Sequence, residues 1–478
     1  MGLFAVGKGI STAMGFLLNL LLTRSTTTAA YGAYAYAWTL ITIIEVFADL
    51  GSSKSVLRYM PDFKEDSENR SYILGLGYVT GVSTSLVIAL GIYISAPVIS
   101  SLTLNSSLFE DVLRVFALVL PFNSVGNVAR ESLRGSGHID EHIIARQVIP
   151  PVLRVLTVGI GLVVGYSIIG LVATLVVAAA IAMVVAVAIA TSHDLLQPSF
   201  TISRTGVNKF YRTAVPLAFR DIGTFLYSRV DVLMLGILLG ANAVGIYNVP
   251  VLLAGVLSLP LTGINQLFPA VAGELFANDD RQTLQILHHV IVRWSFSTTV
   301  LIGAVIGIFR TDILALFGVK YVAGGTVLML FILAYLIDSI AAGSAYVLMM
   351  SDHQWILFVN QWTFGIVNVT LNYVLIPRFG IQGAAIATVI SYILMNMARI
   401  IELWYYEGIF PYSITLAKPI LANIGALIAI RSTAAFLEGL TAIATGGIVG
   451  IIVFGVLLYG LGIEQQDREI FAQIRGAF

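Results

Sequence analysis

The segment TAVPLAFRDIGTFLYSRVDVLMLGILLGANAVGIY occupies residues 213–247 and is apolar over a length that crosses a lipid bilayer. It nevertheless contains two arginines and two aspartates: Arg220, Asp221, Arg229 and Asp231. A charge inside the hydrocarbon is costly, and it usually faces a water-filled cavity or a partner of opposite charge. The segment therefore predicts a membrane protein with a functional site along this helix.

The overall composition indicates the same class. Of the 478 residues, 58% are hydrophobic and 11% are charged, and the mean hydropathy is +0.92, whereas a soluble domain carries about 25% charged residues. The backbone must satisfy its own hydrogen bonds within a bilayer, so we expect an all-α polytopic protein. The net charge of zero indicates no bulk attraction to nucleic acid, and the absence of cysteine excludes thiol catalysis and thiolate metal sites.

Fourteen stretches are each near the ~20 residues needed to span the hydrocarbon. They are 2–24, 33–57, 72–98, 110–131, 143–165, 168–190, 213–240, 242–266, 288–309, 322–346, 356–376, 382–406, 413–432 and 441–463. With the N-terminus inside, sixteen of the 26 Lys and Arg residues fall at the cytoplasmic side, six fall outside and four fall within spans. Cytoplasmic loops carry an excess of basic residues. We therefore expect a multi-pass protein of the plasma membrane with both termini in the cytoplasm.

Three pairs of segments repeat at a nearly constant offset. The pairs are AYGAY (30–34) with AVGIY (243–247), Gly170 with Gly383, and 118–138 with 333–353. Each copy holds six predicted spans, an even number, so both copies have the same orientation. Two parallel lobes related by an axis along the membrane normal are a known transporter layout, with the substrate bound between them.

The repeat predicts a division of the chain into four parts. We expect a six-helix lobe over 1–190, a cytoplasmic linker over 191–212 and a second six-helix lobe over 213–408. Residues 409–478 fall outside the repeat and are expected to form an appended helical hairpin with a cytoplasmic tail.

Four stretches carry a resemblance to a known family. They are YGAYAYAWTLITIIEVFADLGSSKSVLRYMP (31–61), SRVDVLMLGILLGANAVGIYNVP (228–250), NQLFPAVAGELF (265–276) and LNYVLIPRFGIQGAAIATVIS (371–391). In combination and order they resemble the Wzx-type polysaccharide and oligosaccharide flippases of the MOP superfamily. The resemblance implies a V-shaped, MATE-like core of two six-helix lobes that moves polyprenyl- or dolichyl-(pyro)phosphate-linked glycans. The extra terminal hairpin is similar to that of lipid II flippase relatives.

Basic residues within the spans are the candidate contacts for the anionic head of such a lipid. They are Lys8, Arg154, Arg220 and Arg229. Arginine matches phosphate oxygens with two parallel hydrogen bonds, and a hydrated cationic cavity lowers the cost of moving an anion through hydrocarbon. The alternative is a structural role, in which these residues pair with buried carboxylates. The available carboxylates are Glu45, Asp49, Asp221, Asp231 and Asp338.

Helical geometry separates the two arginines of the seventh span. At ~100° per residue, Arg220 and Asp231 share one face and Arg229 points to the opposite side. We expect only one of the two arginines to face the main cavity, and we favour Arg220. Arg229 and Asp231 match the family pattern and are candidates for an interhelical packing or gating element.

The carboxylates Glu45, Asp49, Asp231 and Asp338 are candidates for coupling or gating. Glu45 and Asp338 suit either an H⁺ or Na⁺ coupling site or counter-charges to the arginines. Asp49 and Arg58 suit a structural pair or an interfacial snorkel. Amides within the spans suit sugar binding or helix–helix hydrogen bonds equally; they are Asn123, Asn265, Gln266, Asn368 and Asn372.

The predicted function is translocation of a lipid-linked oligosaccharide by alternating access, for surface polysaccharide or glycoprotein assembly. An ion gradient or consumption of the product outside would supply the energy. The alternative is a MATE-type multidrug or metabolite cation antiporter, which the central basic residues disfavour. We expect no enzyme activity, cofactor or metal site, and a monomer in contact with membrane lipid. HIDEH (138–142) matches a zinc signature but lacks a third ligand, and no Walker A sequence occurs.

Overall fold

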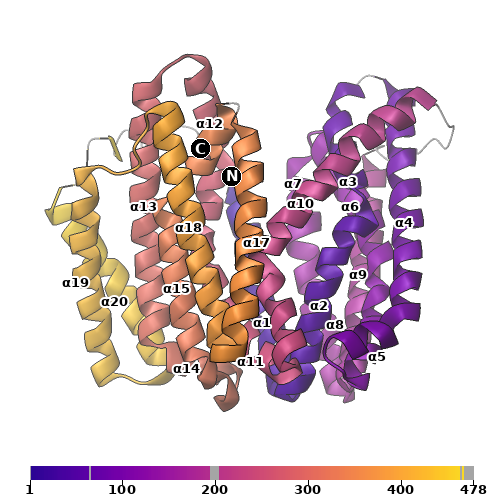
Figure 1. Cartoon of the computed structure of the whole chain (residues 1–478), viewed down its shortest axis with the longest axis horizontal. Helices are drawn as coiled ribbons and strands as arrows, with labels where there is room; N and C mark the ends of the chain where they lie inside the picture. Colours follow the sequence, from indigo (N-terminus) through magenta and orange to yellow (C-terminus); the bar gives the residue numbers. More distant parts are fainter. Residues whose placement is uncertain are drawn as a thin grey trace. The chain divides into compact units, whose positions relative to one another are not determined.

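The computed structural model describes residues 2–63, 66–193, 204–351, 353–462, 464 and 466–467, and these residues form helices and connecting turns with no strand. By packing, the chain divides into two compact units, Met1–Asn248 and Val249–Phe478 (Figure 1). Each unit is a helical bundle. The all-α fold predicted from the sequence is confirmed.

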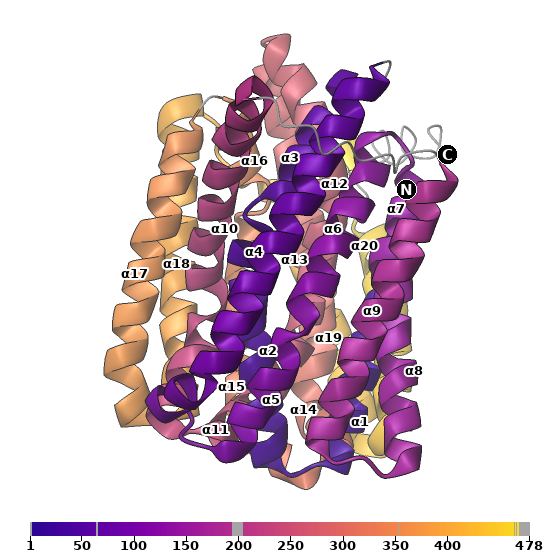
Figure 2. The same ribbon diagram turned by 90° about the vertical axis from the view of Figure 1, so that its right-hand side faces the viewer.

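The first unit is built around α2, α4, α6 and α9. Its elements are α1 (Gly2–Ser25), α2 (Thr28–Asp49), α3 (Ser52–Tyr59), η1 (Pro61–Phe63), α4 (Ser67–Leu102), α5 (Ser107–Ala117), α6 (Val119–Gly135), α7 (Ile139–Ile143), the π-helix η2 (Ile144–Val148), α8 (Ile149–Val164), α9 (Ile168–Ser192), α10 (Arg204–Leu239) and the start of α11 (Ala241–Ala254). Helix α6 packs on α4 and α9, and α8 packs on α9 and α1 (Figure 2). Helix α10 packs on α2, α3 and α4. Buried side chains such as Val56, Leu74, Val128 and Phe210 join α3, α4, α6 and α10 in one core.

The second unit continues from α11. Its elements are η3 (Gly255–Ser258), α12 (Leu259–Ala277), α13 (Arg281–Ile308), α14 (Arg310–Phe317), η4 (Val319–Gly324), α15 (Gly325–Ile340), α16 (Ser344–Met350), α17 (Gln354–Phe379), α18 (Ile381–Glu407), η5 (Ile414–Leu416), α19 (Ala417–Phe436) and α20 (Gly439–Gly460). Helix α18 packs on α15 and α17, and α13 packs on α15. The terminal hairpin of α19 and α20 packs on α13.

Among the described residues, 11 helical segments are long and apolar enough to cross a membrane. All of them coincide with predicted spans. The other three predicted spans coincide with α2, α10 and α17, which have 22, 36 and 26 residues. Polar residues lower the hydropathy of two of these: Glu45 and Asp49 in α2, and Asn360, Asn368 and Asn372 in α17.

One predicted span, 33–57, was wrong in its boundary because the backbone breaks within it. The predicted span 33–57 is divided at Leu50 and Gly51, whose φ angles are 45° and 69°. A left-handed backbone favours glycine, and a Cβ on Gly51 would also lie 2.2 Å from the carbonyl oxygen of Ala214. The predicted span 110–131 is confirmed, because α5 and α6 adjoin at Leu118 and Ser107–Gly135 is one of the 11 candidate spans.

The predicted linker 191–212 is only partly a connection between helices. Helix α9 ends at Ser192 and α10 begins at Arg204, so residues 204–212 are helical. Residues 194–203 lie outside the described part of the chain. The sequence-based division into lobes at this linker stays a prediction.

Candidate functional site

One face of α2 carries an aromatic and acidic stripe. Tyr34, Trp38 and Glu45 occur at helical spacing, so they project from the same side of the helix. The guanidinium carbon of Arg154, on α8, lies 4.8 Å from the centre of the Trp38 ring. Such a cation–π contact is stronger when desolvated. Tyr34, Glu45 and Arg130 are ionisable groups near Arg154, and within the described residues Arg154 forms no salt bridge.

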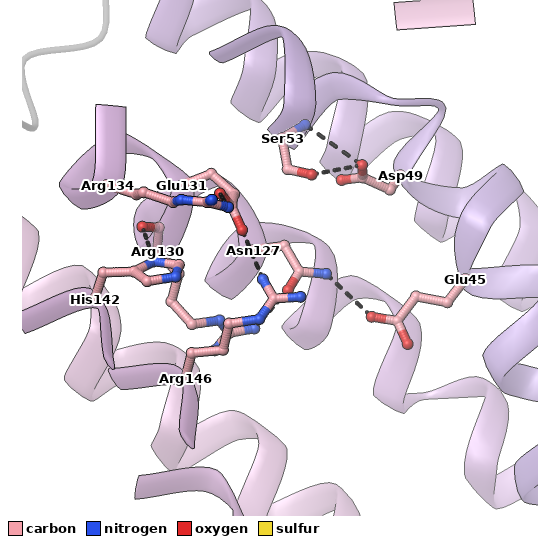
Figure 3. A network of polar contacts seen from close by, with 9 residues as sticks. All are labelled: Glu45, Asp49, Ser53, Asn127, Arg130, Glu131, Arg134, His142 and Arg146. Carbon is pink, nitrogen blue, oxygen red and sulfur yellow. Dashed lines mark hydrogen bonds and ion pairs between the residues drawn. The ribbon is translucent and has the colours of Figure 1, made fainter. Parts of the chain in front are cut away.

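Glu45 belongs to a hydrogen-bonded network with α6. Asn123 and Asn127 each donate their amide to the Glu45 carboxylate, at 3.3 and 3.1 Å. Arg130 donates to the Oδ1 atom of Asn127 at 2.8 Å. Asn127 therefore bridges a carboxylate and a guanidinium through opposite ends of one amide group (Figure 3). We call Glu45, Asn127 and Arg130 the first triad.

Further arginines surround the first triad. The side chain of Arg130 is 7% exposed, and both Arg146 and Arg154 lie close enough to oppose its positive charge. Arg146, on η2, donates to Glu131 at 2.6 Å (Figure 3). The first unit thus gathers arginines from α6, η2 and α8 around the Glu45 and Glu131 carboxylates. This arrangement favours an anionic ligand, because an added anion relieves the repulsion among the guanidinium groups.

The second unit contains a matching arrangement. Asn396 donates to Asp338 at 3.3 Å, and Arg399 donates to the Oδ1 atom of Asn396 at 3.2 Å. Arg399 also lies 3.9 Å from the Asp338 carboxylate. We call Asp338, Asn396 and Arg399 the second triad.

Both triads use an asparagine and an arginine three residues apart on one helix. The sequences are NVAR at 127–130 and NMAR at 396–399. Positions i and i+3 are neighbours on a helix surface, which is why the arginine reaches the asparagine side chain. Sequence reasoning counted Arg130 and Arg399 only as cytoplasmic-side charges. The recurrence of Asn-x-Ala-Arg was the signal in the sequence that would have identified them.

The structure separates Arg229 from Asp231, as helical geometry predicted. Arg229 is exposed, whereas Asp231 is 4% exposed. The hydroxyl of Tyr247 and the backbone N–H of Val232 donate to the Asp231 carboxylate. Asp231 thereby joins α10 to the start of α11.

The other predicted site residues belong to neither triad, although Asp49 lies one helical turn after Glu45 on α2 (Figure 3). Asp49 accepts hydrogen bonds from Ser52 and Ser53 at the start of α3, and Arg58 pairs with Asp62 at 3.4 Å. Of the two alternatives for these residues, the structural pair of Asp49 with Arg58 is not formed, and the interfacial position of Arg58 stays a prediction. Lys8 is half-buried on α1.

The last six predicted residues add no contact to either triad among the described side chains. The side chains of Arg220, Asp221, Asn265 and Gln266 lie outside the described residues. Asn368 donates to Ser391 at 3.1 Å and so joins α17 to α18, whereas Asn372 donates to Asn368 at 2.9 Å within α17.

Replacing Asn127 with alanine is expected to destabilise the first unit by about 1–3 kcal/mol, because a partly buried carboxylate and guanidinium both lose a partner. Thermal unfolding of the purified protein in detergent measures the loss. Asn69→Ala is the matched control: it removes an exposed hydrogen bond to Asp66 and should change stability by no more than about 0.5 kcal/mol. Equal effects of the two substitutions would contradict a structural role for the first triad.

The helical units, in which charged residues lie within apolar helices long enough to span a membrane, share the fold of solved MOP superfamily proteins. The structure titled "Lipid II flippase MurJ, inward closed conformation" is similar with a TM-score of 0.75 and 14% identity, over 96% of this chain and 98% of that chain. A multidrug resistance MATE family transporter in an inward-facing conformation has a TM-score of 0.69 and 14% identity, over 87% and 99%. A MOP superfamily transporter from Pyrococcus furiosus has a TM-score of 0.58 and 15% identity, over 86% and 95%.

The sequence identifies the family within this class. The profile described as "Polysaccharide biosynthesis protein" matches residues 1–273. The chain belongs to this polysaccharide biosynthesis protein family. A search of curated proteins finds no match. The predicted membership of a polysaccharide biosynthesis family is confirmed.

Proposed function

We propose that the chain flips a lipid-linked oligosaccharide across the cell membrane by alternating access, with both termini in the cytoplasm. The family and the fold support a membrane flippase or transporter role. The observation that carries the finer proposal is Arg154. It lies in a membrane-spanning helix over the Trp38 ring, without a salt bridge among the described residues.

The chemistry of the proposed substrate matches this residue. A lipid-linked glycan has a phosphate or diphosphate between its polyprenyl or dolichyl tail and its sugars. The tail stays in the bilayer, so the costly step is moving the anion and the sugars through hydrocarbon. Arginines that are desolvated and incompletely paired stabilise a phosphate strongly, because charge-assisted bidentate hydrogen bonds are the strongest that side chains make.

The remaining predicted residues have places in this proposal. We propose Lys8, Arg220 and Arg229 as further headgroup contacts along the passage, and Glu45, Asp49, Asp231 and Asp338 as coupling or gating groups. Glu45 and Asp338 each sit in a triad, so protonation or Na⁺ binding at either would release the bridging asparagine. We propose a monomer coupled to H⁺ or Na⁺, or driven by removal of the glycan outside.

Depletion of the protein tests the proposal directly. We expect lipid-linked glycan to accumulate in the cytoplasmic leaflet, where a membrane-impermeant glycosidase or lectin cannot reach it from outside. Unchanged glycan distribution together with sensitivity to cationic drugs would support the MATE-type antiporter instead. The structural similarity to MATE transporters is the observation that supports this second candidate.

A further inference from the structure

Two histidines meet at one end of the first unit. His138 lies in the turn between α6 and α7, and His193 is the residue that follows α9. Their ring centres are 4.2 Å apart, and the Nε2 atom of His193 lies 3.5 Å from the carboxylate of Glu141 on α7. The two rings therefore join the end of α9 to the α6–α7 turn. We call His138 and His193 the histidine pair.

The second unit has the same arrangement at the repeat positions. His353 is 215 residues after His138, and Tyr406 is 213 residues after His193. The ring centres of His353 and Tyr406 are 4.3 Å apart, and His353 precedes α17 as His138 precedes α7. The two turns are thus built alike, and each serves as a reference for the other.

The turn histidines differ in what surrounds the Nδ1 atom. In the second unit, Nδ1 of His353 lies 3.4 Å from the Glu407 carboxylate and 3.2 Å from the Ser351 hydroxyl oxygen. In the first unit, Nδ1 of His138 is buried and has no hydrogen-bond partner among the described residues. A protonated imidazole carries an N–H on both nitrogens. His353 can therefore hold a second proton where it lies, whereas His138 would bury an unpaired, charged N–H, which is costly.

The ring beside each turn histidine increases this difference. Histidine is the side chain that gains a charge between about pH 5 and 8, whereas tyrosine stays neutral there. In the first unit, a proton on each ring would place two positive charges in contact, where they repel. In the second unit, Tyr406 adds no charge. Glu407 opposes the charge on His353, although it also pairs with Arg281 at 3.3 Å.

Other charged groups at this end of the first unit have contacts of their own or are exposed. They are Glu131 and Arg134 on α6, Asp140 and His142 on α7, and Arg146 on η2. Both arginines pair with the α6 carboxylate, at 3.8 and 2.6 Å, and the α7 imidazole lies 2.8 Å from a backbone carbonyl oxygen of α6 (Figure 3). Helix α9 carries no titratable residue, and Asp194 lies outside the described part of the chain. Among the described residues, Glu141 is the counter-charge that forms an ion pair with the histidine pair.

We infer that the histidine pair is a proton-sensitive clasp, which holds the end of α9 to the α6–α7 turn and opens on acidification. Protons are disfavoured in the closed pair, so the contact is kept at higher pH and is lost as the pH falls. The same change keeps or tightens the His353 turn. The first turn leads through α7 and η2 into α8, which carries Arg154, so opening frees the start of this segment from α9. The inference does not depend on the proposed substrate.

Hydrogen exchange measured by mass spectrometry tests the clasp on the full-length protein in detergent. The reporters are the backbone N–H groups of His138 and His353, which donate to the carbonyl oxygens of Leu133 and Leu348 at 2.9 and 3.0 Å. Exchange is measured at pH values of about 7.5 and 5.5, with a chelator present, and is corrected for its intrinsic dependence on pH. A free imidazole has a pKa of about 6.5, so this acidification favours the release of one histidine about tenfold. We expect exchange around His138 to rise about tenfold and exchange around His353 to stay level or fall.

Two matched substitutions assign the response. His138→Phe keeps a ring against His193 without a nitrogen, so exchange in the first turn should no longer depend on pH. His353→Phe makes the same change at the repeat position and should leave the response of the first turn intact. If His138→Phe fails to fold, the wild-type protein still decides the question, because the two turns are compared within one molecule.

Equal pH dependence in the two turns overturns the clasp, and so does a response in the first turn that persists in a folded His138→Phe variant. The measurement involves no glycan and no transport. A rise confined to the first turn therefore supports the clasp even if depletion leaves the glycan distribution unchanged, a result that would remove the proposed substrate alone.

Discussion

Replacing Arg154 with alanine is expected to reduce glycan export about 30-fold or more, the largest functional effect of any single substitution in the first unit. Truncating one partner of a desolvated, charge-assisted contact costs about 2–5 kcal/mol, and each 1.4 kcal/mol corresponds to about tenfold. Arg154 makes a contact of this kind if its guanidinium binds the phosphate while it stacks on the Trp38 ring. Export is measured as transfer of labelled lipid-linked glycan across vesicles that contain the purified variant.

Two further substitutions separate this role from a structural one. Arg154→Lys keeps the charge but loses the planar group that stacks on tryptophan and grips phosphate with two bonds, so we expect intermediate export. Arg114→Ala is the matched control: Arg114 also lies over an aromatic ring, that of Tyr93, but pairs with Glu110 at 2.8 Å. Export should stay near the wild-type level in that control. Wild-type export by a folded Arg154→Ala variant would remove Arg154 from the site.

The largest loss of stability is expected from Asp467→Ala. Asp467 follows α20 and accepts hydrogen bonds from Arg293 and from the indole of Trp294, both on α13. The side chains of Arg293 and Asp467 are 5% and 6% exposed. Arg293 keeps Thr415 as a partner at 2.6 Å, but its charge loses its counter-ion. Removing one partner of a buried ion pair costs about 3–5 kcal/mol.

Unfolding of the purified protein in detergent measures this loss. Arg58→Ala is the control, because it breaks an ion pair with Asp62 whose side chains are 62% and 43% exposed; exposed pairs contribute about 0–1 kcal/mol. A loss for Asp467→Ala no larger than for the control would show that the terminal hairpin does not depend on this pair. Asp467→Asn keeps the acceptor oxygen without the charge. Its loss of stability should lie between those of Asp467→Ala and the Arg58→Ala control.

Sequence alone determined the class of protein, the positions of its helices and the residues whose charges lie within them. Hydropathy over ~20 residues is a local property, so every predicted span coincides with a helix, although the break at Gly51 was missed. Glu45, Arg154 and Asp338 were identified as candidate site residues because a charge within an apolar stretch can be seen in the sequence without knowledge of its neighbours. The repeat offset also paired His138 with His353 before their contacts were known.

Only the tertiary structure decided which of these groups meet. Glu45 bonds to Asn123 and Asn127, which are 78 and 82 residues away, and Asp338 bonds to Asn396, which is 58 residues away. A pair of Asp49 with Arg58 was one of two alternatives, and Asp49 instead binds the start of α3. The partner of a buried charge depends on the rotation and register of helices packed side by side. Those quantities come from side-chain packing over the whole bundle, whereas membrane insertion depends only on the apolar length of each segment.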